Sequence, residues 1–195
     1  MMKRTIALVL CGLLLIGLVG CGKKAETPGD TTTTVEVAAT DATDLLTQVW
    51  NSYADADKFP IGGGDFDNIV MDAPGKYDVS KAEEMDSTLG LPQSSAALID
   101  DAASMMHMMN ANTFTGGVYH VADAANQDAV VDSLKDNIMN RQWMCGFPDT
   151  LIVAKVGGEY VVSAFGNAEI IETFKTNLKA TFEMTDVVVE ESLAE

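Results

Sequence analysis

Two apolar runs near the C-terminus constrain the fold of this chain more than any other feature. Thr150–Val156 and Glu159–Ala164 are rich in β-branched residues and are joined by Gly157-Gly158. Two glycines can take the positive φ angles of a tight turn, so the pattern predicts an antiparallel hairpin. Apolar residues occupy both faces of each run, which indicates strands inside a sheet rather than at its edge.

Helical patterns surround this hairpin. Asp123 opens an amphipathic segment that continues to about Trp143, and Asn167 is a suitable N-cap for a last helix. Near the start of the domain, Asp41 is a suitable N-cap for a helix expected to end near Asp57. The sequence therefore predicts an α+β fold, in which a small antiparallel sheet packs against helices.

Three segments carry weaker signals. Ala96–Met109 has good helix formers, but Val118–Val121 follows it at a distance suited to a strand pair, so helix and strand both remain open. Ile61–Tyr77 is expected to be irregular, because Gly62-Gly63-Gly64 and Pro74-Gly75 break regular structure, and within it strand and packed loop both remain open for Asn68–Met71. Residues 185–195 are expected to form an acidic tail.

The first residues have the three parts of an export signal. Lys3 and Arg4 precede an apolar run, Thr5–Val19, and small Gly20 stands before Cys21. The run is shorter than the roughly 20 residues that a membrane-spanning helix needs. Residues 1–20 are therefore expected to be removed, residues 21–40 to form a flexible linker, and residues 41–184 to form a single domain.

The residues Leu18-Val19-Gly20-Cys21 resemble the lipobox of bacterial lipoproteins. In that family the cysteine is alkylated by a diacylglycerol and becomes the N-terminus of the mature protein. The resemblance implies lipidation at Cys21 and attachment to the outer face of the cell membrane. Attachment through more than one acyl chain is lasting, whereas a single chain binds reversibly.

The C-terminal half resembles an uncharacterised family of lipoproteins from Gram-positive bacteria, known only as a domain of unknown function. The similarity covers Val118–Val121, the helix with Arg141, Thr150–Val153 and Gly158–Val162, while Phe147-Pro148 stands where the family has Tyr-Pro. The resemblance implies the order β-β-α-β-β-α after an N-terminal helix, and it favours a strand over Ala96–Met109. It supplies no catalytic residues.

Charge and cysteine content exclude several classes of partner and site. The formal net charge is −17, and removal of a leader that carries Lys3 and Arg4 makes the remainder more acidic. Such a surface repels nucleic acid and anionic lipid headgroups. Once Cys11 leaves with the leader and Cys21 is lipidated, Cys145 has no cysteine partner, so no disulfide is expected.

The run Met105-Met106-His107-Met108-Met109 is the most unusual chemical feature. On a strand, Met105, His107 and Met109 share one face and offer sulfur, nitrogen and sulfur, which suit Cu(I). Methionine also fills irregular core gaps, and we favour this core interpretation over a metal site.

Two further candidates are weaker still. Cys145 could pair with His107 or His120 as nucleophile and base, but no residue is placed by the pattern to orient the base. The acidic residues around Gly62-Gly63-Gly64, among them Asp65 and Asp67, lack the order of a calcium loop and are expected to be solvated.

The sequence therefore predicts a lipid-anchored extracytoplasmic protein, with no enzymatic activity and no cofactor. It is expected to be a binding or scaffolding module for an envelope protein or a small ligand. The alternative is a copper-binding lipoprotein that uses Met105, His107 and Met109.

Overall fold

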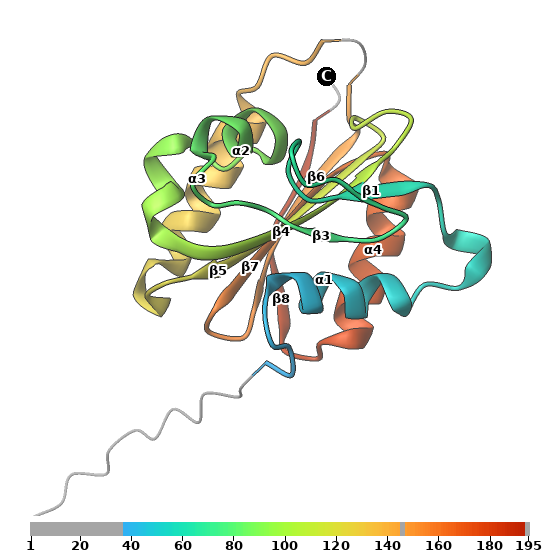
Figure 1. The fold of residues 1–195 in the computed structure, drawn as a ribbon, viewed down its shortest axis with the longest axis horizontal. Helices are drawn as coiled ribbons and strands as arrows, with labels where there is room; N and C mark the ends of the chain where they lie inside the picture. Colours follow the sequence, from blue (N-terminus) through green and yellow to red (C-terminus); the bar gives the residue numbers. More distant parts are fainter. Residues whose placement is uncertain (1–36, 145–146, 194–195) are drawn as a thin grey trace, which may run out of the picture. The chain divides into compact units, whose positions relative to one another are not determined.

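The computed structural model describes residues 37–144 and 147–193. In these residues eight strands form one antiparallel sheet, and helices cover both of its faces (Figure 1). The α+β fold expected from the sequence is confirmed. The strands are β1 (Ile61–Gly63), β2 (Val70–Met71), β3 (Gly75–Lys76), β4 (Ile99–His107), β5 (Phe114–Val121), β6 (Thr150–Val156), β7 (Tyr160–Gly166) and β8 (Thr185–Ser192). Their order is β2-β1-β4-β5-β7-β6-β8, and β3 also pairs with β4.

The helices divide between the two faces of the sheet. The α-helices are α1 (Ala42–Asn51), α2 (Ala82–Leu89), α3 (Gln127–Met139) and α4 (Ala168–Thr181). Three short 3-10 helices are η1 (Asp55–Asp57), η2 (Gln93–Leu98) and η3 (Ala124–Asn126). Helices α1 and α4 enclose a first core, and α2 and α3 enclose a second core on the other face (Figure 1).

Strands β6 and β7 form the hairpin expected around Gly157-Gly158, with Gly157 at a φ of +62°. They lie inside the sheet, between β5 and β8. Along β6, Ile152 enters the first core while Leu151 and Val153 enter the second. Apolar residues occur on both faces of these strands because helices exclude water from both sides of the sheet.

Side-chain caps stabilise the N-termini of helices α1 and α4. The Asp41 carboxylate accepts a hydrogen bond from the Asp44 amide at 2.7 Å, which caps α1 as expected. The side chain of Asn167 accepts from the Glu169 amide and caps α4. Helix α1 ends at Asn51, earlier than predicted, and η1 follows it. Helix α3 likewise ends at Met139, before the predicted limit.

The prediction of an acidic tail from residue 185 is wrong for Thr185–Ser192, which form edge strand β8. A β-bulge shifts the register of β8 against β6, so Val187 packs against the first core and Val189 enters the second. Two of the acidic residues are paired: Glu190 contacts Lys175 of α4 at 2.7 Å, and Glu191 contacts Lys135 of α3 at 2.9 Å.

Two other segments also differ from the expectation. Ile61–Tyr77 is not irregular throughout, because β1 and β3 both pair with the outer edge of β4. The open choice over Ala96–Met109 is resolved as a 3-10 helix that leads into strand β4. Pairing with neighbours distant in sequence overrides the local signal in both places.

The described chain enters the domain at one end of the sheet. Val37, which the sequence placed in the linker, is only 6% exposed and packs in the first core. The amide of Ala42 then donates to the Asp101 carboxylate at 2.9 Å, close to the start of β4. Within residues 37–144 and 147–193, no helix has the length and apolar character needed to cross a membrane.

Candidate functional site

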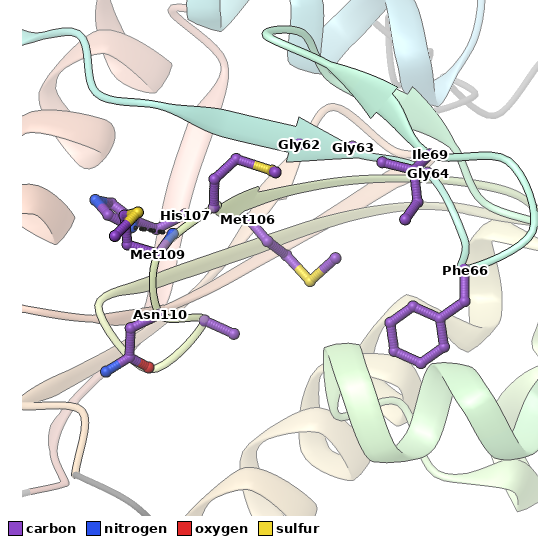
Figure 2. A pocket seen from close by; sticks show the side chains of 11 residues that line it. Gly62, Gly63, Gly64, Phe66, Ile69, Met106, His107, Met109 and Asn110 are labelled. Atoms are coloured by element: carbon purple, nitrogen blue, oxygen red, sulfur yellow. Dashed lines mark hydrogen bonds between the residues drawn. The ribbon is translucent and has the colours of Figure 1, made fainter.

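An apolar groove lies at the opposite end of the sheet, where β4 ends. One wall is β1 with the loop that carries Phe66 and Ile69, and the other is the segment Met106–Ala111 (Figure 2). The groove encloses about 270 Å³. Apart from His107, none of its lining side chains ionises. We call this site the methionine groove, and its chemistry suits an apolar ligand.

A glycine forms part of the surface of the groove. A β carbon built on Gly62 would lie 2.6 Å from Sδ of Met108 and 3.8 Å from Cγ2 of Ile69. Because Gly62 has no side chain, the Met108 thioether rests directly on the backbone of β1. The absence of a side chain thus keeps the two walls close together.

A buried hydroxyl fixes β1 to β4. Oγ of Ser104 donates to the Gly64 carbonyl and accepts from the Gly64 amide, both at 2.9 Å. Gly64 has a φ of +89°, which favours glycine at this turn. Since Ser104 is fully buried, these two hydrogen bonds satisfy a hydroxyl that would otherwise be costly to bury.

The loop after Gly64 is held by a buried carboxylate. Asp65 is only 2% exposed, and its Oδ1 accepts hydrogen bonds from Lys81 Nζ at 2.5 Å and from the Asp67 amide at 3.0 Å. The side-chain amide of Asn68 also donates to it, at 3.1 Å. Lys81 reaches Asp67 at 2.6 Å as well. Asp65 and Asp67 were expected to be solvated: Asp67 is exposed, whereas Asp65 is buried and shares the Lys81 ammonium group with it.

These contacts change the acidity of both partners. Burial by itself would raise the pKa of Asp65, but hydrogen bonds from Lys81, Asn68 and the Asp67 amide outweigh it and lower the pKa to about 2. The hydrogen bonds to Asp65 and then Asp67 raise the pKa of Lys81 above its usual value. The pair is therefore charged at every pH at which the domain would function.

A second contact holds Phe66 itself. The Phe66 amide donates to Oε1 of Glu84 in α2 at 2.8 Å, and the Tyr77 hydroxyl donates to the same oxygen at 3.1 Å. The phenyl ring is nevertheless 61% exposed. The hydrogen bond to α2 thus holds the backbone of this wall in place, while the Phe66 side chain is exposed to solvent.

Exposed apolar side chains surround the groove. Of the side chains that line it, Ile69 is 57% exposed and Met109 83%, and Phe66 and Met108 are also exposed. Isolated exposed apolar residues are ordinary, but a group of them around a groove is typical of an interaction site.

The three residues predicted as metal ligands do not share one surface. Met105 is fully buried in the first core, whereas Met109 lies beyond the end of β4 and is the most exposed of the three. His107 stacks on Phe59, with ring centroids 5.4 Å apart, and its Nδ1 accepts a hydrogen bond from the Met109 amide at 3.1 Å. A neutral imidazole with this bond carries its proton on Nε2, so neither nitrogen has a free lone pair.

The sequence pattern identified this run but not the groove. Met106 and Met108, on the opposite strand face from Met105, line the groove together with Met109. Alternation along β4 could have separated these two faces, but no local signal showed that β1 would pack beside them.

The remaining predicted residues divide between the described and undescribed parts. Cys21, the predicted lipidation site, and Cys145, the candidate nucleophile, lie outside the described residues. His120 lies far from the groove in the fold, with Nδ1 2.5 Å from the Asp100 carboxylate. Within the described ranges, no three His, Cys, Asp or Glu side chains are grouped so that they could hold a metal ion.

No protein-family model, no curated protein and no solved structure matches this chain. Its function must therefore be inferred from its residues and their geometry.

Proposed function

We propose that this chain is a lipid-anchored extracytoplasmic protein that binds an apolar ligand or partner in the methionine groove and has no catalytic activity of its own. The observation that carries the proposal is the group of exposed apolar side chains that line a groove whose walls are fixed by buried polar contacts. Fixed walls lower the entropic cost of binding, because little of the site must be ordered when a ligand arrives.

The position of the groove fits a protein attached through its N-terminus. The chain enters beside Asp101 near the start of β4, and the groove lies at the other end of this nine-residue strand. Asp101 and Met106, which lines the groove, are five residues apart on this strand, or about 17 Å. The groove is therefore separated from the point at which the described chain enters the domain.

The anchor is tested by mass spectrometry of the protein purified from bacterial membranes. We expect the mature chain to begin at Cys21 and to carry a diacylglycerol on its sulfur. Replacement of Cys21 by Ser should leave an unprocessed chain, since the thiol is the group that is alkylated. A free thiol at position 21, or another N-terminus in the wild-type protein, would contradict the anchor.

The groove is tested by NMR of the full-length protein in zwitterionic nanodiscs, with carbon-13 in the methionine methyl groups. Titration with 1-hexanol, a neutral apolar probe, should shift the signals of Met106 and Met108 in a saturable way. Met139 is exposed on α3 outside the groove and serves as the internal control. Ile69→Thr should weaken the effect about tenfold, since about 1.4 kcal/mol of apolar contact corresponds to that factor. Equal shifts of all methionine signals, or shifts that do not saturate, would contradict binding of the probe in the groove.

A further inference from the structure

We infer that the natural occupant of the methionine groove is a cationic amphipathic peptide segment of a partner protein, which inserts apolar side chains between the two walls. The inference rests on the proposed function of the same groove and specifies the chemistry of its ligand.

The size of the groove favours side chains over a whole small molecule. Pockets for drug-sized ligands usually measure about 300–1,000 Å³, and this groove encloses about 270 Å³ and is open to solvent. Phe66 stands at one end, Asn110 at the other, and Met106 lies between them (Figure 2). A few apolar side chains from one face of a larger partner would fill this space.

The residue types favour a helical partner. Thioether side chains are flexible and polarizable, so Met106, Met108 and Met109 can adapt to the apolar anchors of an amphipathic helix. Addition of a strand beside the groove would need a long free edge, and β2, the edge strand at this side of the sheet, offers only two residues. Insertion of a helix face therefore fits this site better than strand addition.

The charge of the surroundings favours a cationic partner. The net charge of the chain is −17, and exposed Asp72 directly follows Met71, whose backbone pairs with Gly62 in the groove wall. A second copy of this acidic chain would bring like charges together, which disfavours self-association. Lysine or arginine beside the apolar anchors would instead find complementary carboxylates.

The test measures binding of synthetic 18-residue peptides to the full-length protein in zwitterionic nanodiscs, with the signal of empty nanodiscs subtracted. The probe contains leucine and lysine arranged to form an amphipathic helix. One control peptide has the same composition with leucine spread over all faces, and another keeps the leucine pattern but replaces lysine with glutamate. We expect saturable binding of the probe and at least tenfold weaker binding of both controls.

Protein variants distinguish binding in the groove from non-specific electrostatic attraction. Ile69→Thr combined with Met108→Gln should weaken probe binding at least tenfold without a change in charge. Val188→Thr, at an exposed valine of β8 outside the groove, should leave it unchanged. Asp72 has a φ of +59°, which asparagine also tolerates, so Asp72→Asn should remove only the charge and weaken binding about threefold.

The outcomes separate the two proposals. The inference that the groove binds a cationic amphipathic segment would be overturned by equal binding of the scrambled or glutamate peptide. It would also be overturned if the double variant bound the probe as well as wild type does. If 1-hexanol still shifts the groove methionines in that case, the apolar binding site stands and only its assigned occupant is wrong. If neither ligand acts at the groove, both proposals fail.

Discussion

Gly63→Ala is expected to destabilise the domain by about 3 kcal/mol, at the upper end of the usual cost of overpacking. A β carbon at Gly63 would lie 2.1 Å from the backbone nitrogen of Gly75 and 2.6 Å from the carbonyl oxygen of Ser104. Both obstacles are backbone atoms of paired strands and cannot rotate away. Strand β1 would have to separate from β3 and β4, which would also open one wall of the methionine groove.

Gly62→Ala is the matched control for this prediction. The added β carbon would meet Sδ of Met108, near the end of a flexible side chain that can rotate. We expect a loss below about 1 kcal/mol, typical of a site that can adapt. Urea unfolding of the two variants gives the comparison. Equal losses, or a larger loss for Gly62→Ala, would contradict the close backbone contact between β1 and β3.

The same glycines show where prediction from sequence fails. The hairpin of β6 and β7 could be predicted because its signal is local: two β-branched runs and the glycines between them. Gly63 and Gly75 carry the opposite local signal, since glycine normally interrupts strands. They lie in strands because their two backbones approach each other too closely for side chains, and Gly63 also lies against the carbonyl of Ser104, about 40 residues away.

Strand β8 could not be predicted for a similar reason. Asp186, Glu190 and Glu191 give the segment the composition of a solvated tail. The lysines of α3 and α4 that pair with two of these carboxylates come from distant parts of the sequence. The strand is stabilised by Val187 and Val189, which reach opposite cores only because of the bulge against β6.

For the candidate site, the sequence singled out the run that lines the methionine groove, but the predicted metal ligands belong to the other strand face. Alternation along a strand separates Met105 from Met106, but it does not show which set is buried. Packing of α1 and β5 places Met105 in the first core. The groove then forms from the other set, because β1 pairs with the outer edge of β4 at Met106 and His107.

Asp65→Ala is expected to cost about 2 kcal/mol at neutral pH, because it removes the buried carboxylate that Lys81 and Asn68 both contact and frees the wall that carries Phe66. Asp67→Ala is the matched control: Asp67 contacts the same ammonium group but its side chain is 81% exposed. Exposed ion pairs contribute at most about 1 kcal/mol, so its loss should be small. Equal losses would show that burial of Asp65 is not what makes the contact stabilising.

The pH dependence of the stability of Asp65→Ala tests whether the charge of Asp65 is the cause of the loss. The pKa of Asp65 is about 2 in the folded domain against an ordinary value of 3.8, so its ionisation stabilises the fold above pH 3.8. This contribution falls as the pH drops from about 4 through 2, where the carboxylate is protonated. The difference in unfolding free energy between wild type and Asp65→Ala should therefore be constant near neutral pH and narrow below pH 4. Urea unfolding across this range measures it, and a difference independent of pH would mean that the Asp65 side chain acts by shape rather than by charge.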